Sequence, residues 1–432
     1  MANTYLQKSA FGSANQKTYT ISFWSKLSQS TTGNVLAFVA GGNYVRLFFE
    51  NGALKIKSVI NSSTVFEVKT NRLFRDFSSW YHFVIAMDTT QATSSNRIKF
   101  YVNGVQETSL ATATYPSQNF DTDSNNDLKI GYNGTDNYFD GLLSHFHYID
   151  ATAYDASAFG STDSVTGEWS INTSPSVTYG SGGFLILKDG NTITDQSSNS
   201  NNFTLGGGTL TPTEDCPSNV FACFNNLIAQ TGATFANGNT FVYRSSAGNV
   251  KRIGCTIGAT SGKYYAEFQL GTNQWGGVCL TNGGDIARTE AGSNGYMGEY
   301  AADKSVGVRQ DGIVYSSGAN VSSAQWNQGS LGATDKLCLA LDLDNKKLFL
   351  GKNGVWSSSS NPASNTGGIT LTGDSYTFCG ATDNADCKIN TGNGYFGTDA
   401  ISSEGSNASG IGKFEYDVPT GYTALSTKGL NL

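Results

Sequence analysis

Short runs of alternating hydrophobic and polar residues recur along almost the whole chain, and polar turn clusters separate them. In the first half these runs lie at 19–27, 45–49, 54–60, 81–88 and 97–102, and in the second half at 263–270, 276–281, 304–309, 335–343 and 347–351. A period of two, together with many β-branched and aromatic residues, is typical of strands that bury one face in a sheet. Only 152–160 resembles a helix, and it is short. The pattern therefore predicts an all-β fold.

The turn clusters contain strong hairpin signals. Asn-Gly pairs at 51–52, 103–104 and 353–354 each follow an apolar run. Asn and Gly readily adopt the left-handed backbone that two-residue hairpin turns need. Asp344-Asn345 separates two further apolar runs, so we expect a tight turn there as well.

A polar tract rich in Gly, Ser, Asn and Thr extends from about 189 to 219 and contains three successive glycines and two prolines. Such a composition is typical of a domain boundary. We predict a first domain at 1–210, a linker at 211–224 and a second domain at 225–432. Because a sheet with one apolar face needs a second layer to cover it, each domain should be an antiparallel, jelly-roll-like β-sandwich.

Composition narrows the class of protein. The 432 residues include 12% aromatic and 14% charged residues, and the net charge is −7. The aromatic content excludes general disorder, and the acidic balance argues against nucleic acid as a partner. No apolar run approaches the roughly 18 residues of a membrane span, so we expect no membrane insertion. The first twenty residues lack the basic and apolar regions of a secretory signal, so we expect synthesis in the cytosol.

The seven cysteines form no C-x-x-C pair, and with only three histidines a zinc site is not expected. We expect buried thiols, although the spacing also allows a Cys379–Cys387 or a Cys216–Cys223 bridge. His82 lies in an expected strand, and His145 and His147 alternate in another, which places those two on one sheet face. No nucleophile motif accompanies the histidines, so packing against a sheet is the expected role.

Three stretches of the first half resemble the laminin-G/concanavalin A-like jelly-roll family. They are YTISFWSK at 19–26, WYHFVIAMDTT followed by NRIKFYVNGVQ between 80 and 106, and the segment 128–160 with IGYNGTDNYFDG. The resemblance implies a lectin-like jelly roll over about 1–205 and no particular activity.

The second half resembles the SPRY (B30.2) family over about 225–432. The matching stretches are SGKYYAEF at 261–268, VGVRQDG at 306–312, DKLCLALDLDNKKLFLGKNG at 335–354 and FEYDVPTGYTAL at 414–425. The tandem pairing, with TEDCPSNVFACFN at 213–225, is similar to structural proteins of marine tailed bacteriophages. That likeness implies a virion protein, made in the bacterial cytoplasm and released by lysis.

We expect no enzymatic activity. Glycoside hydrolysis needs two carboxyl groups flanking a cleft, and the E-x-D-x-E run of related jelly-roll glycosidases is absent. Asp342 and Asp344 have suitable spacing, but the SPRY resemblance places them at a strand end and a turn. A polysaccharide depolymerase stays the less favoured alternative.

Calcium is the one candidate cofactor, because the family often holds Ca²⁺ at one rim of the sandwich. Calcium takes six to eight oxygen ligands. The loop 131–141 falls where rim ligands of the family lie and supplies Asn133, Asp136 and Asp140, and Asp88 ends a strand. Asx residues are also ordinary turn formers, so both roles stay open.

A glycan site is the more specific hypothesis, because sugars bind aromatic platforms beside polar side chains on loops. Tyr132 and Tyr138 bracket the polar residues Asn133 and Asp136. In the second half the candidate loop or strand-end aromatics are Trp275, Tyr296, Tyr300 and Trp326.

These observations predict a bacteriophage structural protein, either a tail fibre or a head fibre/decoration component. It would act as a non-enzymatic adhesin for a host surface glycan, with other virion proteins and further copies of itself as partners. Multivalent display would compensate for weak single-site binding. The alternative is a purely structural decoration protein without glycan binding.

Overall fold

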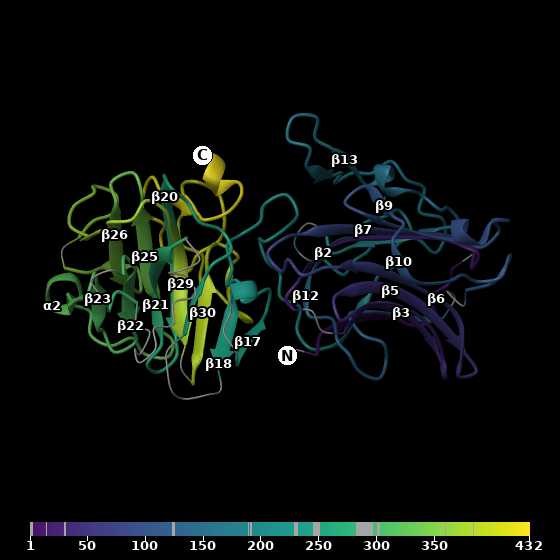
Figure 1. Ribbon diagram of the computed structural model, residues 1–432, viewed down its shortest axis with the longest axis horizontal. Helices are drawn as coiled ribbons and strands as arrows, with labels where there is room; N and C mark the ends of the chain where they lie inside the picture. Colours follow the sequence, from purple (N-terminus) through teal and green to yellow (C-terminus); the bar gives the residue numbers. More distant parts are fainter. Residues whose placement is uncertain are drawn as a thin grey trace. The chain divides into compact units, whose positions relative to one another are not determined.

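The computed structural model describes residues 3–13, 15–29, 32–122, 126–188, 190, 192–228, 232–244, 251–281, 297–299, 303–358, 360–382 and 384–432. The chain forms two compact units, each with its own sheets (Figure 1). Unit 1 contains Met1–Pro212 and Cys216–Ser218, and unit 2 contains Thr213–Asp215 and Asn219–Leu432.

Unit 1 contains two antiparallel sheets and a hairpin. Sheet A has the order β10 (Leu110–Thr114), β6 (Ser63–Leu73), β5 (Ala53–Ile60), β4 (Asn43–Glu50), β3 (Gly33–Ala40), β11 (Asp127–Ile130), β1 (Tyr5–Lys8), β16 (Thr204–Gly207). Sheet B has the order β15 (Phe184–Ile186), β12 (Gly141–Asp150), β2 (Thr18–Leu27), β7 (Tyr81–Asp88), β8 (Ile98–Val102), β9 (Val105–Glu107). The remaining elements are the hairpin β13 (Gly160–Thr162) and β14 (Trp169–Ile171), and the 3₁₀ helices η1 (Ser94–Asn96) and η2 (Ala156–Ala158).

The two sheets of unit 1 pack face to face through their aromatic side chains. The rings of Phe38 in sheet A and Tyr148 in sheet B lie 5.9 Å apart, and those of Phe49 and Phe83 lie 5.4 Å apart. The outer face of sheet B is covered in turn by residues of the segment 154–179, Phe159 among them, which pack on its buried side chains. The outer face of sheet A instead carries charged and polar side chains.

Unit 2 repeats the two-layer arrangement. Sheet C has the order β17 (Ala233–Ala236), β18 (Phe241–Arg244), β30 (Asp386–Asn390), β20 (Lys263–Leu270), β25 (Leu337–Asp342), β26 (Lys347–Lys352), β27 (Val355–Trp356), with β28 (Ile369–Thr370) beside β26 and β33 (Thr423–Ala424) parallel to β20. Sheet D has the order β19 (Lys251–Gly254), β29 (Tyr376–Thr382), β21 (Trp275–Leu280), β22 (Val306–Arg309), β23 (Val314–Ser316), β24 (Ala319–Asn320). The small elements are the pair β31 (Tyr395–Phe396) and β32 (Asp399–Ala400), α2 (Ser322–Gln325), η3 (Asn226–Ile228) and η4 (Gly429–Asn431).

A single apolar core joins sheets C and D, with Phe268 and Leu339 from one sheet and Val278 and Phe378 from the other. Both units are therefore β-sandwiches, and the all-β prediction is confirmed. The end of the segment 211–224, expected as a linker, is packed: the side chains of Phe221 and Phe224 are buried within unit 2.

The Asn-Gly pairs form the hairpins that their sequence indicates. Asn51 and Gly52 have φ of 51° and 82° between β4 and β5, and Asn103 and Gly104 have φ of 46° and 82° between β8 and β9. Two successive positive φ angles are the signature of the type I′ turn. Asn353 and Gly354 repeat it between β26 and β27.

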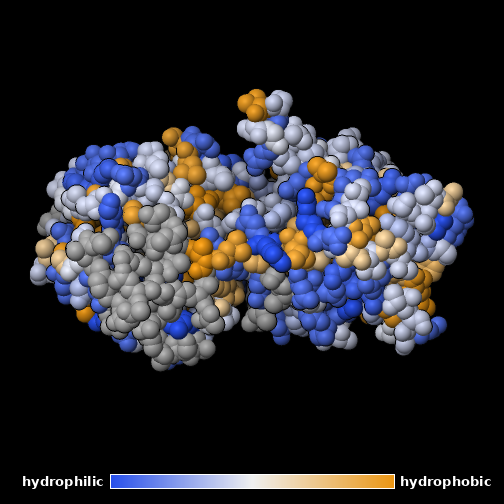
Figure 2. Space-filling view, in the orientation of Figure 1, coloured by the Kyte–Doolittle hydropathy of each residue, from blue (hydrophilic) through white to orange (hydrophobic). Residues whose placement is uncertain are grey.

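All seven cysteines are thiols, and all except Cys216 are buried. Within the described ranges, no helix has the length and apolar character needed to span a membrane. On the face drawn in Figure 2, hydrophobic residues form several small groups among hydrophilic ones.

Candidate functional site

The loop that joins β11 to β12 stacks two tyrosines of the expected glycan site against each other. The rings of Tyr132 and Tyr138 lie 4.3 Å apart and only 7° from parallel. Both side chains are half-buried, and the loop residues between them are largely exposed. Burial and the neighbouring Tyr138 hydroxyl raise the pKa of Tyr132. Its phenol therefore stays protonated at neutral pH and can donate a hydrogen bond.

Asn133 gives this loop its shape. Its side-chain oxygen accepts hydrogen bonds from the backbone N–H of Thr135 (2.9 Å) and of Asp136 (2.8 Å), and its amide donates to the Asp136 carboxylate (2.9 Å). The backbone N–H of Phe139 donates to the Gly131 carbonyl at 2.9 Å and closes the loop. Asn133 is thus a turn former whose side-chain atoms all bond within the loop. It thereby fixes the position of the two tyrosines relative to each other.

Two residues that the sequence analysis did not identify complete the aromatic cluster. The Tyr5 ring, from β1, lies 4.9 Å from that of Tyr132. The Lys129 ammonium, from β11, lies 5.4 Å from the centre of the Tyr132 ring and 5.9 Å from that of Tyr5. Lys129 forms no ion pair within the described part of the chain. We call Tyr5, Lys129, Tyr132 and Tyr138 the tyrosine platform.

Glycines of β16 make room for the platform. A Cβ atom built on Gly206 would lie 2.1 Å from a carbon of the Tyr5 ring. The Gly206-Gly207-Gly208 run, which suggested a domain boundary, therefore has a packing reason as well.

Gly206→Ala should destabilise unit 1 by about 1–3 kcal/mol, because the new methyl group must displace the Tyr5 ring. Gly42→Ala is the matched control, since a Cβ there meets nothing within 4 Å. Denaturant unfolding and nuclear Overhauser contacts between Tyr5 and Tyr132 would measure both effects. Equal stability of the two variants would contradict the close packing of Tyr5 on β16.

The two tryptophan candidates of unit 2, which lie within the described residues, are buried. Trp275 begins β21 and is 0% exposed, beneath Met297 and Tyr315. Trp326 is 6% exposed and donates its indole N–H to the Gly329 carbonyl at 2.7 Å. The prediction that these two tryptophans lie at an exposed site is wrong, because both are core residues. Tyr296 and Tyr300 lie outside the described residues.

The candidate calcium ligands are not all brought together: Asn133 and Asp136 are hydrogen-bonded to each other, but Asp88 lies far from Asp140. Asp88 pairs with Thr18 at one end of β2, whereas Gly141, beside Asp140, pairs with Leu27 at the other end. The length of β2 separates the two carboxylates by roughly 30 Å. Asp88 accepts hydrogen bonds from Thr90 and Gln91, and Asp140 accepts one from Gln29. Among the described residues, no group of three or more His, Cys, Asp and Glu side chains is placed to hold a metal. The proposed ligand set does not fit one calcium ion.

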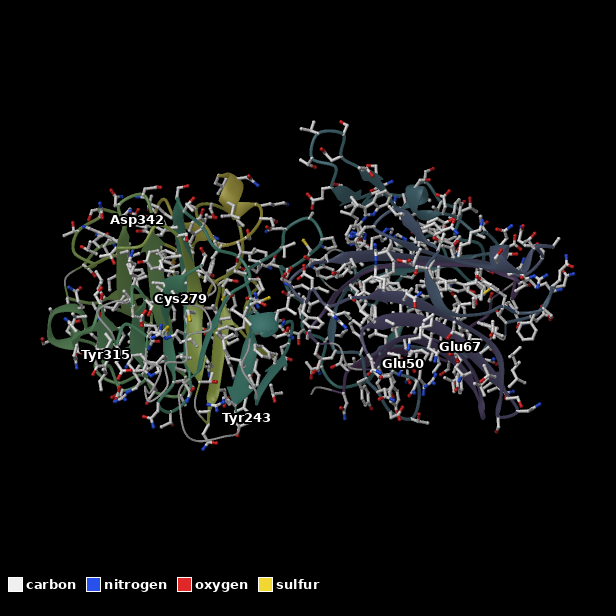
Figure 3. All side chains as sticks on the ribbon, in the orientation of Figure 1. Glu50, Glu67, Tyr243, Cys279, Tyr315 and Asp342 are labelled. Atoms are coloured by element: carbon white, nitrogen blue, oxygen red, sulfur yellow. The ribbon has the colours of Figure 1, made fainter. Side chains whose placement is uncertain are left out.

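Two carboxylates missed by the sequence analysis do lie close together, on the outer face of sheet A (Figure 3). Glu50 and Glu67 contact the same ammonium group, that of Lys55, at 3.4 and 2.9 Å. Hydrogen bonds from Lys69 lower the pKa of Glu50, and hydrogen bonds from Lys55 and Lys57 outweigh burial and lower that of Glu67. Both carboxyls are held ionised, whereas glycoside hydrolysis needs one protonated acid.

The carboxylate pair considered from the sequence, Asp342 and Asp344, forms hydrogen bonds around the turn between β25 and β26. Asp342, at the end of β25, bonds the backbone and side chain of Asn345 and pairs with Lys263 at 3.1 Å. Asp344 accepts the backbone N–H of Gly262 at 2.7 Å. Both side chains thus stabilise local backbone.

The histidines are packed against sheet B. The His82 ring stacks on that of Trp24, with ring centroids 4.9 Å apart, and Trp169 donates its indole N–H to His82 Nδ1 at 3.1 Å. His147 bonds the Tyr179 hydroxyl through Nδ1 at 2.9 Å. His145 occupies a β-bulge with φ of 46°, which interrupts the alternation on which its placement rested.

Comparison with known proteins agrees with the architecture of unit 1. Residues 1–158 match the family described as the concanavalin A-like lectin/glucanases superfamily. This match confirms the expected concanavalin A-like jelly roll. No curated protein sequence matches the chain.

Solved structures similar to parts of the chain include two SPRY domains and a pentraxin. The SPRY domain of human HERC1 is 18% identical with a TM-score of 0.29, over 38% of this chain and 96% of that one. The PSpry domain of TRIM65 is 12% identical with a TM-score of 0.29, over 39% and 88%. The heptameric SAP-like pentraxin from Limulus polyphemus is 14% identical with a TM-score of 0.28, over 35% and 72%.

Proposed function

We propose that the protein is a non-enzymatic adhesin of a bacteriophage particle and that the tyrosine platform of unit 1 binds a host surface glycan. The parallel stack of Tyr132 on Tyr138, fixed by the Asn133 turn, carries this proposal. Sugars offer apolar C–H faces that pack on aromatic rings, and hydroxyl groups that pair with polar donors at the edge. The phenols and the Lys129 ammonium supply such donors.

The charge state of the paired carboxylates supports binding without hydrolysis. Lysine contacts keep Glu50 and Glu67 ionised, so neither can protonate a leaving group at neutral pH. These two carboxyl groups therefore do not supply the protonated acid that a depolymerase needs.

The virion location rests on the resemblance of the tandem architecture to phage structural proteins. Reduced thiols agree with assembly in a bacterial cytoplasm. Display of many copies, as a tail fibre or a head fibre, would raise the effective concentration of weak sites. Further copies and other virion proteins are then the structural partners.

Tyr138→Ala should weaken glycan binding by about tenfold or more, because it removes an aromatic contact worth about 1.5 kcal/mol. Glycan arrays of host polysaccharide would find the ligand, and biolayer interferometry would measure its affinity. Tyr101→Ala, on sheet B, is the control and should bind normally.

Experiments on the same protein distinguish the adhesin from the two alternative functions, a structural decoration protein and a depolymerase. Assembly into labelled particles without any carbohydrate affinity would favour a purely structural decoration protein. Release of reducing sugar ends from host capsule would favour a depolymerase. Either result would overturn the adhesin proposal.

A further inference from the structure

Unit 2 contains a groove at the rim where β20 and β29 begin and β21 ends. Its volume is about 400 Å³, within the roughly 300–1,000 Å³ of small-ligand pockets. The side chains that define it are those of Thr260, Ser261, Tyr264, Thr281, Ser375 and Leu430. The groove therefore lies between the two sheets of unit 2, with the C-terminal turn η4 as one lip.

Tyr264 is the most informative residue of the groove. Only 4% of its surface is exposed, and its hydroxyl makes no hydrogen bond to any residue that the structure describes. Burial and the nearby Asp344 carboxylate raise its pKa, so the phenol stays protonated. The hydroxyl of this otherwise buried side chain is accessible from the groove, so that water or a ligand can pair with it.

The backbone at Gly262 leaves space for the Tyr264 hydroxyl. Gly262 has φ of 89°, and a Cβ atom there would lie 2.6 Å from that hydroxyl oxygen. The backbone N–H of Gly262 donates to Asp344 at 2.7 Å, which fixes the strand entry. The position of the phenol is thus determined by the turn beneath it.

The rest of the lining carries no charge, and most of its side chains are hydroxyl-bearing. Thr281 and Ser375 bond each other through their hydroxyls, and the exposed Thr260 and Ser261 add two more. Leu430 is 40% exposed and offers an apolar contact. None of the described residues that line the groove is charged, and Asp344 close by disfavours an anion.

Hydroxyl donors and acceptors, one buried phenol and one apolar lip match the surface of a neutral sugar, which has hydroxyl edges and C–H faces. We propose that this groove binds one or two residues of a neutral saccharide, as a site separate from the tyrosine platform. With both sites the chain is bivalent, and a polysaccharide that reaches both is held at higher effective concentration.

Saturation-transfer NMR on the full chain tests this site. The probes are maltotriose, cellotriose, xylotriose and the trisaccharide of N-acetylglucosamine, with a trigalacturonate as the anionic comparison. All samples carry Tyr132→Ala together with Tyr138→Ala, which removes both stacked rings of the platform of unit 1. At least one neutral trisaccharide should show transfer.

Two variants remove the site by different routes. Tyr264→Phe with Ser375→Ala deletes two hydroxyls, and Ser261→Trp fills the groove from an exposed position. Each should weaken the bound trisaccharide at least tenfold. Tyr243→Phe removes a phenol from β18 of the same unit (Figure 3) and is the control. Thermal melting checks folding, and Tyr264→Phe should melt normally because no protein hydrogen bond is lost.

The outcomes decide the proposal. Transfer that is lost in both variants and kept in the control supports it. Absence of transfer from every neutral probe, transfer that survives both variants, or tighter binding of trigalacturonate overturns it. None of these results depends on whether the tyrosine platform binds glycans.

Discussion

Glu267→Ala is expected to lower the free energy of unfolding of unit 2 by about 4 kcal/mol at pH 8. The Glu267 carboxylate is fully buried in β20 and accepts hydrogen bonds from two backbone N–H groups, those of Glu415 (2.9 Å) and Tyr416 (2.8 Å). The Tyr265 hydroxyl (3.1 Å) and the Asn390 amide (3.2 Å) donate to it as well. Alanine leaves these donors buried without an acceptor.

The measurement is denaturant unfolding of the full chain. Glu214→Ala is the matched control, because Glu214 is 41% exposed and pairs with Lys413, and such surface pairs contribute less than about 1 kcal/mol. Similar midpoints for the two variants would mean that the four hydrogen bonds to Glu267 do not stabilise the fold.

Acidification from pH 7 to pH 5 is expected to destabilise unit 1 by roughly 4 kcal/mol. Burial lowers the pKa of His82 to about 3 and that of His147 well below its ordinary value. An unfolded histidine has a pKa of about 6.5. Between that value and the folded values the unfolded chain binds more protons, so stability is lost as the pH falls through this window.

Unit 2 provides an internal comparison, because all three histidines lie in unit 1. Burial raises the pKa of Glu267 to about 7, so that this group stabilises unit 2 as the pH falls from 7 toward its unfolded value. Unfolding measured at pH 7, 6 and 5 should therefore show the free energy of unfolding of unit 1 decreasing as the pH falls. His147→Gln, which leaves one buried histidine, should show about half the loss. A flat profile for unit 1 would contradict neutral, buried histidines.

Local sequence signals predicted the strands and hairpins well, because they depend on neighbouring residues. Alternation identifies a half-buried strand, and Asn51-Gly52 and Asn103-Gly104 select a turn by their own backbone preference. The burial of Phe221 could not be predicted in this way, because Phe221 pairs with Ser426, about two hundred residues away.

The candidate site was predictable only in part for the same reason. Tyr132 and Tyr138 lie in one loop and could be paired from the sequence. Tyr5 joins them because β1 pairs with β11 across more than a hundred residues. Trp275 has the same alternating neighbours as an exposed strand-end aromatic, and only the layer above sheet D makes it a core residue.

The buried cysteine thiols of unit 2 can be used to follow its unfolding. Six buried cysteines lie within unit 2, and the half-exposed Cys216 belongs to unit 1. An alkylating reagent should modify Cys216 at once and reach the other six only when unit 2 opens. Mass spectrometry of the added label would then time the opening of one unit, with no probe attached to the protein beforehand.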